Sequence, residues 1–218
     1  TEITTKQFSL SDATNPILTS FTPKTRKFFT KYDHNTILEL REKRKRDIKM
    51  KQDQCKTSAQ ASKGGWWCLT LDDAKKQHRL DIVLADYLQN NLFAGKHVGD
   101  FGGGWGHYTL FFREHGLVAS ARAFDGNPMY HGAPGAIVQV EDLSELFPDY
   151  ETIPMFDWVM TLEVGEHVPP ENEDNFIQNV ASRAKEGIVL SWAVPGQGGI
   201  GHYNNKANLY VQARFLEY

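Results

Sequence analysis

The segment Asp100-Phe101-Gly102-Gly103-Gly104-Trp105-Gly106 places an acidic residue directly before a run that contains four glycines. Glycine has no Cβ, so the backbone can turn sharply there and a ligand can approach it closely. A glycine loop between a strand and a helix is typical of nucleotide-binding sites, although the loop alone does not identify the nucleotide. We expect a cofactor to contact this loop, at the positions Asp100, Phe101, Gly102, Gly104 and Gly106.

The acidic residue before the loop indicates which ligand fits. A carboxylate at Asp100 suits the cationic amino group of a methionine moiety, directly or through water. The same carboxylate would repel a pyrophosphate at the N-terminus of the following helix. The pattern therefore favours S-adenosylmethionine (SAM) over a dinucleotide. The alternative is a tight turn that binds no ligand.

Two further acidic positions follow at the ends of expected strands. Asp125 comes about 20 residues after the loop, the spacing expected of a carboxylate that binds ribose hydroxyls. Glu141-Asp142-Leu143 ends the next expected strand. The alternative for Asp125-Gly126-Asn127-Pro128 is a plain turn, because all four residue types favour turns.

A cluster of two carboxylates and one imidazole follows the fourth expected strand, in Glu163-Val164-Gly165-Glu166-His167. Mixed oxygen and nitrogen ligands suit a divalent ion such as magnesium or manganese. Alternatively, His167 acts as a general base near neutral pH, or Glu166 simply caps a helix. His202, which follows a glycine-rich stretch, is a candidate fourth ligand, whereas His107 and His131 are expected to be surface side chains.

With these residues in place, the stretch 96–192 resembles the class I, Rossmann-like SAM-dependent methyltransferases. The resemblance implies that 100–106 is their first cofactor motif. It also implies that Asp125, with Gly126 beside it, binds the ribose, and that Glu141, Asp142 and Leu143 meet the adenine.

The spacing Glu-x-x-Glu-His is similar to that of two groups of metal-dependent O-methyltransferases. One group methylates the terminal 2′-hydroxyl of small plant RNAs, and the other methylates catechol-like precursors of ubiquinone. The resemblance implies catalytic roles for Glu163, Glu166 and His167, and a metal held by these three residues with His202. Glu-His-Val-Pro also occurs in methyltransferases without a metal, so a general-base role for His167 stays open.

The elements that must position these residues alternate between strands and helices. Strands are expected at 97–100, 118–124, 136–140, 156–163 and 188–193, and helices at 73–91, 105–115, 171–185 and 208–216. This alternation predicts an α/β fold with a doubly wound, mostly parallel sheet that binds ligands at the carboxyl ends of its strands. The family's sheet normally ends in an antiparallel strand pair after the last helix. We expect either that these C-terminal strands are missing from the sequence or that the sheet is completed otherwise.

Charge divides the chain into an N-terminal extension, 1–65, and a SAM-dependent methyltransferase domain, 66–218. Up to Gln60 there are 13 Lys/Arg and 7 Asp/Glu, a balance of +6, and the remaining 11 and 20 give −9. A capping box at 36–39 predicts a basic helix over 37–50. Nucleic acid, a membrane surface or the protein's own acidic body could meet that helix. No apolar run reaches the roughly 20 residues of a membrane span.

Cys55 and Cys68 allow two interpretations. They can close a small disulfide loop in an oxidising compartment such as the secretory lumen, or they can remain reduced in a cytoplasmic enzyme. The sequence starts at Thr1, which is compatible with removal of a targeting segment.

The function expected from these patterns is methyl transfer from SAM to an acceptor hydroxyl of a glycan, an RNA or a small metabolite. The glycine-rich stretch 196–201 is expected to act as a lid on the acceptor side. The alternatives are a non-catalytic SAM-binding regulatory partner and a dinucleotide-dependent oxidoreductase.

Overall fold

A single seven-stranded sheet organises the protein. The structure, a computed structural model, describes residues 5–6, 17–20, 34–56, 65–147 and 153–218. The strands follow one another across the sheet in the order β1-β2-β7-β6-β3-β4-β5. Their bounds are β1 Thr5–Lys6, β2 Ile17–Ser20, β3 His97–Phe101, β4 Ser120–Asp125, β5 Val138–Val140, β6 Phe156–Leu162 and β7 Ala184–Ser191.

The five strands from β7 to β5 are all parallel, which confirms the predicted Rossmann-like methyltransferase fold. The chain order reverses direction across the sheet between β3 and β6, so the carboxyl ends of these two strands flank the switch point where such sheets bind ligands. Beyond β7 the sheet continues through β2 and then β1, each antiparallel to its neighbour. Strands of the N-terminal segment therefore extend the sheet beyond β7. The domain boundary at residue 65 stays a prediction.

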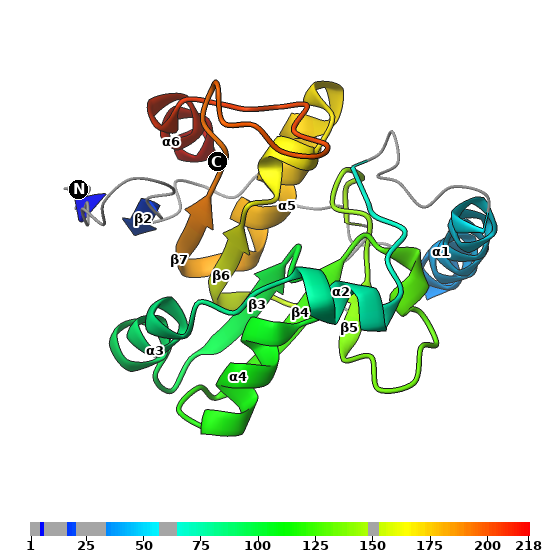
Figure 1. Ribbon diagram of the computed structural model, residues 1–218, viewed down its shortest axis with the longest axis horizontal. Helices are drawn as coiled ribbons and strands as arrows, with labels where there is room; N and C mark the ends of the chain where they lie inside the picture. Colours follow the sequence, from blue (N-terminus) through cyan, green and yellow to red (C-terminus); the bar gives the residue numbers. More distant parts are fainter. Residues whose placement is uncertain (1–4, 7–16, 21–33, 57–64, 148–152) are drawn as a thin grey trace.

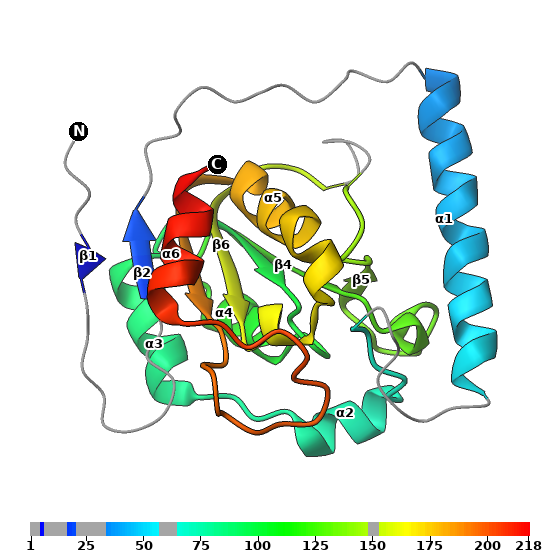
Figure 2. The same cartoon turned by 90° about the horizontal axis from the view of Figure 1, so that it is seen from above.

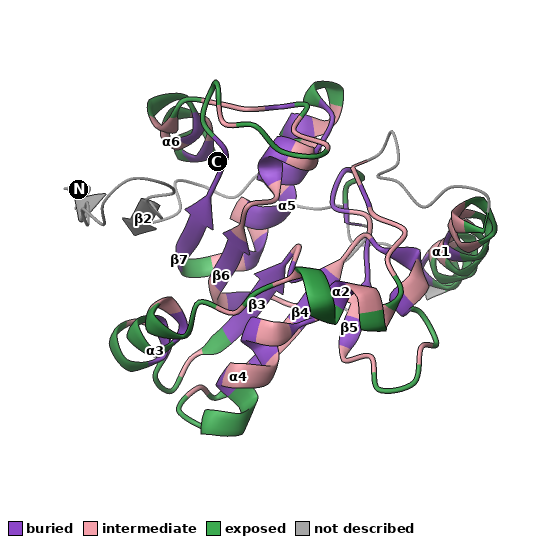
Figure 3. Ribbon diagram, viewed as in Figure 1, coloured by how far each residue is buried: buried purple, intermediate pink, exposed green. Residues whose placement is uncertain are grey.

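Helices cover both faces of the sheet (Figures 1 and 2). The helices α3 (Ile82–Asn91) and α4 (His107–His115) pack on one face, where Leu88 and Phe112 meet strand residues such as Val98. The helices α5 (Glu173–Arg183) and α6 (Asn208–Leu216) pack on the other. The five parallel strands β3 to β7 are largely buried, as Figure 3 shows.

The helix predicted over 73–91 is wrong as a single element. It is divided into α2 (Leu71–Gln77) and α3, separated by an extended segment at 78–81. Each helix has its own N-cap: the Thr70 side chain accepts from the backbone N–H of Asp73, and Asp81 accepts from Leu84. The apolar periodicity continues through the break, but two local caps stabilise two helix starts.

The other predicted elements are present with shifted ends. The helix predicted over 105–115 begins at His107, and the one predicted over 171–185 spans only Glu173–Arg183. The strand expected at 188–193 already begins at Ala184, whereas α6 has its predicted bounds.

The basic helix α1 (His34–Cys55) is longer at both ends than predicted and lies beside the β5 edge of the sheet (Figure 2). Ile48 packs against the sheet with Tyr130 and Val138. Arg44 forms an ion pair with Glu141, and Lys51 forms one with Asp142. Of the partners considered for this basic segment, the structure therefore shows the protein's own acidic body.

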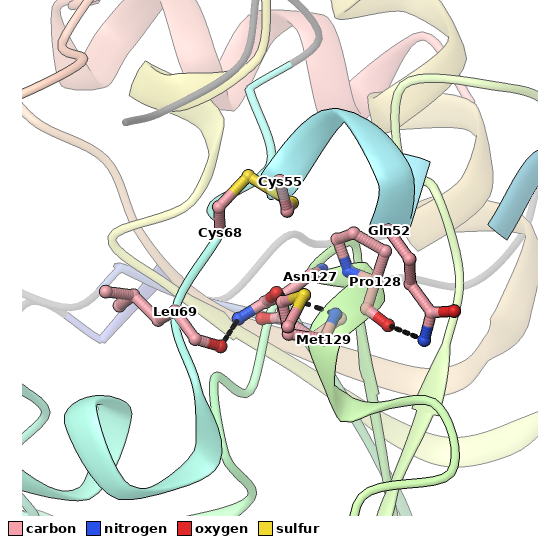
Figure 4. The surroundings of a disulfide bond; sticks show 8 residues. Gln52, Cys55, Cys68, Leu69, Asn127, Pro128 and Met129 are labelled. Carbon is pink, nitrogen blue, oxygen red and sulfur yellow. Dashed lines mark hydrogen bonds between the residues drawn. A yellow bond between two sulfur atoms is a disulfide. The ribbon is translucent and has the colours of Figure 1, made fainter. Parts of the chain in front are cut away.

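A disulfide joins Cys55 at the end of α1 to Cys68, across a sequence separation of 13 (Figure 4). Around it, the Gln52 amide donates to the carbonyl oxygen of Pro128 at 3.0 Å, and the Asn127 amide donates to that of Leu69 at 2.8 Å. Both cysteines are thereby tied to the turn that follows β4.

Candidate active site

A cavity of about 380 Å³ opens at the carboxyl ends of β3, β4, β5 and β6, within the size range of small-molecule sites. Its walls come from the glycine loop after β3, the turns after β4 and β5, and the segment after β6. A fifth wall comes from residues 65–67 and 78–79, which precede β3. The lining residues are Gly65, Trp66, Trp67, His78, Arg79, Gly102, Gly104, His107, Tyr108, Asp125, Gly126, Asp142, Leu143, Ser144, Leu162, Glu163, Val164, His167 and Val168.

The glycine loop is bound to the turn after β4. The backbone N–H of Gly104 donates to Asp125 Oδ2 at 2.9 Å, and that of Gly102 donates to the Phe124 carbonyl oxygen at 2.7 Å. Gly104 has φ +58°, and a Cβ there would lie 2.3 Å from His78 Nδ1. A side chain at Gly104 would therefore be strained and would also collide with a wall of the cavity.

Asp100 lies beneath the glycine loop instead of lining the cavity. Its carboxylate is buried and accepts a hydrogen bond from Thr109 Oγ1 at 3.0 Å, which ties the end of β3 to α4. A Cβ on Gly103 would lie 2.6 Å from this carboxylate, so only glycine leaves space for it. Burial raises the pKa of Asp100 to about 7.

Two other predicted cofactor positions also point away from the cavity. The Phe101 side chain is fully buried in the core, where it packs against Phe124, Phe147 and Phe156. A Cβ on Gly106 would meet Ile137 and Val138 of the β5 region. Gly106 has φ +89° and precedes the first residue of α4, so its place in the motif is explained by the turn into the helix.

Asp125 lines the cavity at the end of β4. Its Oδ1 accepts from the backbone N–H of Asn127 at 2.8 Å, while Oδ2 accepts from Gly104. Burial raises the pKa of this carboxyl to about 6. Gly126 follows, and a Cβ on it would lie 3.0 Å from Trp66, so the cavity wall approaches the backbone there. The structure thus brings both predicted ribose positions to the cavity.

The acidic pair after β5 divides between two environments. The buried Glu141 faces α1, where it pairs with Arg44 and accepts from Gln139 at 2.7 Å, and it does not line the cavity. Asp142 lines the cavity, but its carboxylate binds Lys51 and accepts from the backbone N–H and the hydroxyl of Ser144. Leu143 lines the cavity beside it.

Glu163 follows β6 and adopts a strained backbone. Its φ of +55° makes it the one non-glycine residue with positive φ among the residues described. Strain of this kind clusters at functional sites. The backbone N–H of Glu163 donates to Ser191 Oγ at 2.9 Å, and Gln197 donates to its Oε2 at 3.3 Å. Its Oε1 is buried without a hydrogen-bond partner in the part of the chain that the structure describes.

Glu166, His167 and His202 come together from two different loops. One ligand atom from each lies within 4.8 Å of the others, and the two histidine rings are 5.0 Å apart at their centroids. Both carboxylate oxygens of Glu166 and the Nδ1 of His202 are buried without a hydrogen-bond partner among the described residues. Burial raises the pKa of Glu166, and nearby Glu163 raises it further. Three of the four predicted metal ligands are therefore gathered here, and Glu163 is not part of this cluster.

His167 has a defined orientation. Its Nδ1 lies 3.0 Å from the carbonyl oxygen of Gly201. Because a carbonyl oxygen only accepts, Nδ1 carries the proton and the lone pair lies on Nε2. Burial lowers the pKa of this ring. The edge of Trp67 contacts it, with the ring centroids 5.7 Å apart.

The loop that carries His202 is attached to the same cluster. The backbone N–H groups of Tyr203 and Asn204 donate to the Glu166 carbonyl oxygen at 2.9 and 3.0 Å. Asn204 also donates to the buried carboxylate of Glu173 and accepts from the indole N–H of Trp192. These bonds hold the segment around His202 against the end of β6. The lid role expected for 196–201 stays a prediction.

Several cavity residues were not singled out from the sequence. The expectation that His107 is a surface side chain is wrong, since it lines the cavity and burial lowers its pKa to about 4. His131 is exposed, as expected. Trp67, His78 and Arg79 precede β3 and reach the cavity only through the tertiary fold. The local signal for them is the aromatic pair after Gly65 and the polar break between two helices.

Comparisons with known proteins find similarity among solved structures. No protein-family model and no curated protein sequence matches the chain. Among solved structures, magnesium protoporphyrin IX methyltransferase of Synechocystis PCC 6803 with bound SAH is 22% identical, with 63% of this chain and 69% of that chain covered and a TM-score of 0.46.

Two further solved structures are similar to this chain. A SAM-dependent methyltransferase of Archaeoglobus fulgidus is 22% identical over 62% of this chain and 66% of that chain, with a TM-score of 0.48. A protein of Rhodobacter sphaeroides described as a Zn-dependent alcohol dehydrogenase is 18% identical over 55% and 49%, with a TM-score of 0.45.

No helix among the described residues is long and apolar enough to cross a membrane.

Proposed function

We propose that the protein is a SAM-dependent methyltransferase that transfers the methyl group to an acceptor hydroxyl. The observation that carries this proposal is a single cavity with two kinds of wall. One wall holds the glycine loop, Asp125 and Leu143, as a nucleoside cofactor requires, and the other holds Glu163 and His167. Both lie at the carboxyl ends of parallel strands, where open α/β sheets bind their ligands.

The cofactor would be held by residues that already have defined partners. Asp125 is oriented by two backbone N–H groups and has lone pairs left for two hydroxyl donors, which suits a ribose diol. Leu143 offers an apolar surface to the adenine beside Asp142. When bound, SAM supplies a methyl group on a sulfonium, and transfer forms a C–O bond while the C–S bond breaks and sulfur keeps the electron pair.

The remaining chemical requirement is removal of the hydroxyl proton. His167 Nε2 is available to accept it, because the contact of Nδ1 with Gly201 places the lone pair there. The cavity surface formed by Trp67, His167 and Glu163 would orient the acceptor, and positioning carries much of the rate in such transfers. The acceptor belongs to one of three classes, a glycan, an RNA or a small metabolite. The ion pairs of Arg44 and Lys51 with the protein itself disfavour the RNA.

A divalent metal fits the residues next to this surface. Glu166 presents two buried oxygens without partners, and a cation there would offset the cost of burying its charge. His167 Nε2 and His202 supply the nitrogen ligands, and Glu163 Oε1 is the nearby fourth group. An ion such as magnesium or manganese would lower the pKa of an acceptor hydroxyl and orient it. His167 is then a ligand instead of a general base.

Cofactor binding is tested by calorimetry with SAM and with NAD. The wild type should bind SAM at micromolar concentration and should not bind NAD. Asp125→Asn should weaken SAM binding at least tenfold, because one of the two carboxylate acceptors becomes a donor. The matched control is Asp157→Asn, since Asp157 also accepts from a backbone N–H, that of His97, but does not line the cavity. Binding of NAD but not SAM would replace the proposal with an oxidoreductase.

Methyl transfer and the role of metal are tested together. Labelled SAM should methylate a component of an extract, and identification of the product names the acceptor. On active protein, exhaustive chelation should stop turnover while leaving SAM binding intact. SAM binding without any transfer would indicate a regulatory module. Full activity after chelation, with no metal found by elemental analysis, would exclude the metal and leave His167 as a general base.

A further inference from the structure

We infer that Glu173, the first residue of α5, is a positioning residue that holds His202 next to Glu166 and His167. Glu173 is not among the residues that line the cavity, and it acts through Asn204, which lies two residues after His202. The inference rests on the proposed function, because the step that it serves is the binding of a divalent ion by the three clustered side chains.

Glu173 is a buried carboxylate that receives several donors. The Tyr210 hydroxyl donates to its Oε1 at 2.6 Å, and the Asn204 side-chain amide donates to its Oε2 at 2.9 Å. Lys206 forms an ion pair with the same Oε2 at 3.3 Å. Burial would raise the pKa of this carboxyl, but the hydrogen bonds from Tyr210 and Asn204 and the charge of Lys206 lower it below its ordinary value. Glu173 is therefore charged at neutral pH.

Asn204 is the residue through which this charge reaches the site. Its backbone N–H donates to the Glu166 carbonyl oxygen at 3.0 Å, and its own carbonyl oxygen accepts from the Trp192 indole at 2.6 Å. Its side chain adds the bond to Glu173, and a hydrogen bond to a charged acceptor is stronger than one between neutral groups. Because Asn204 is only 3% exposed, water cannot replace a lost partner. The bond to Glu173 therefore fixes Asn204 beside Glu166.

The place of Glu173 in the chain lets it join two loops from outside the cavity. The segment with Glu166 and His167 continues through a short 3-10 helix, η3 (Pro170–Asn172), into α5, which begins at Glu173. His202 instead lies in the connection between β7 and α6, which passes the beginning of α5 in Figures 1 and 2. The carboxylate of Glu173 therefore ties the second loop to the first.

The ring of His202 depends on the chain around it for its position. Its Nδ1 is buried without a hydrogen-bond partner among the described residues, so no bond at this atom orients the ring. A Cβ on Gly199 would lie 2.1 Å from His202 Nε2, so the backbone of Gly199 packs against the ring. The His167 ring meets it edge-on, with the centroids 5.0 Å apart. A shift of the segment at Asn204 would therefore move His202 away from the cluster.

Binding of Mn²⁺ and of SAM by the full chain separates positioning from general stability. Glu173→Gln removes the charge and replaces one acceptor oxygen by a donor. It should weaken Mn²⁺ binding at least tenfold, measured by calorimetry, and leave the SAM affinity within twofold of wild type. The matched control is Asp174→Asn, because Asp174 is the neighbouring carboxylate but is exposed and pairs with Arg214. This control should change neither affinity.

A double-mutant cycle tests whether Glu173 acts through Asn204. Asn204→Ala removes the side-chain amide and keeps the backbone bonds, and it should weaken Mn²⁺ binding about as much as Glu173→Gln. The double variant should bind Mn²⁺ no more weakly than either single variant, because both changes remove the same contact. Additive losses would overturn the inference. If Glu173→Gln does not fold, Asn204→Ala alone decides, and unchanged Mn²⁺ binding in it would overturn the inference as well.

Amide hydrogen exchange, followed by NMR in the ligand-free protein, gives a measurement that needs no metal. The backbone N–H groups of Tyr203 and Asn204 both donate to the Glu166 carbonyl oxygen. In Glu173→Gln and in Asn204→Ala they should exchange at least tenfold faster than in wild type. The amides in the strands of the sheet should keep their rates, because the change is confined to the His202 segment.

The outcomes separate this inference from the proposed function. If the wild type binds Mn²⁺ and Glu173→Gln binds it equally well, the inference is overturned and the proposed function stands. If Glu173→Gln weakens SAM and Mn²⁺ binding alike, or speeds exchange throughout the sheet, Glu173 supports the whole fold and the inference is again overturned. If the wild type binds no SAM, the proposed function fails, and if it binds no Mn²⁺, the proposed metal fails. The exchange rates of Tyr203 and Asn204 then decide the inference: faster exchange supports it, and unchanged rates overturn it.

Discussion

Three carboxylates in and around this site are wholly or partly buried, and their properties depend on the hydrogen bonds that each one receives. Asp125 receives two backbone N–H groups, Asp100 receives one hydroxyl, and Glu166 receives no hydrogen bond among the described residues. Burial raises the pKa of all three. Asp100 in particular acts as an internal support for the glycine loop, where the sequence suggested a direct ligand contact.

The support role of Asp100 predicts a pH-dependent stability difference. Because its folded-state pKa is about 7, above the reference value of 3.8, the folded protein binds this proton more tightly than the unfolded chain. Its stabilising contribution is present below about pH 4 and is lost as the pH rises through 7. Asp100→Asn stays neutral and keeps an oxygen for Thr109. We expect the stability of this variant, relative to wild type, to rise by more than about 1 kcal/mol from pH 5 to pH 8.

Urea denaturation of the ligand-free proteins at pH 5 and pH 8 measures this difference. Asp157→Asn is the control: the pKa of Asp157 is lowered from 3.8, so its titration is complete below pH 5 and its difference from wild type should stay constant. Parallel pH profiles for Asp100→Asn and wild type would show that Asp100 does not titrate in this range.

At the scale of elements, the shape of the cavity depends on the disulfide that links helix α1 to the segment 65–68. The disulfide ties the end of α1 to Cys68, and the adjacent Trp66 and Trp67 form a wall of the cavity. Lys51 of α1 also lies over the Trp66 ring, 5.6 Å from its centroid. Helix α1 thus positions the cavity wall as well as covering the β5 edge.

This link predicts a joint effect on stability and ligand binding. Replacing Cys55 and Cys68 by serine removes a cross-link over a sequence separation of 13. The loss should destabilise the fold by roughly 2–3 kcal/mol, and SAM should bind more weakly because residues 65–67 are less constrained. Urea denaturation and calorimetry measure the two effects.

Reductant provides the internal control for the disulfide. Reductant should lower the stability and the SAM affinity of the wild type to the values of the double variant. It should leave both properties of the double variant unchanged. Free-thiol titration of denatured, unreduced wild type gives an independent check, and two titratable thiols would rule out the bridge.

At the scale of the whole molecule, the cluster of Glu166, His167 and His202 joins loops that follow different strands. Glu166 and His167 follow β6, whereas His202 lies in the long connection between β7 and α6. An ion bound by both would stabilise the folded state only, by about 2.7 kcal/mol at a concentration of 100 times its Kd. We expect Mn²⁺ to raise the Tm of the wild type.

Two variants and two ligands make this thermal measurement specific. His202→Ala should lose the Mn²⁺ shift but keep a Tm increase with SAM, because the cofactor residues are separate. His131→Ala, which removes an exposed histidine, should keep both shifts. An equal Mn²⁺ shift in His202→Ala would place the ion elsewhere.

The sequence by itself determined the class of fold and the position of the glycine loop. Alternating apolar segments predicted the five parallel strands, because hydrophobic periodicity is a local property. The glycines and Asp125 were likewise identified from local patterns, whereas Leu143 was implied by the resemblance to methyltransferases. The structure brings Gly102, Gly104, Asp125 and Leu143 to one cavity. Charge counts separated the basic extension from the acidic body but left its partner open.

Only the tertiary structure decided which side chains face the cavity and which residues distant in the sequence pair with one another. Phe101 and Asp100 belong to the glycine motif, yet packing buries one in the core and places the other beneath the loop. Arg79 reaches the site because it lies in the extended segment 78–81, where the apolar pattern is interrupted between α2 and α3. The pairing of β2 with β7 and the bond between Cys55 and Cys68 also depend on long-range contacts. Such contacts arise from the way whole elements pack, and local periodicity carries no information about them.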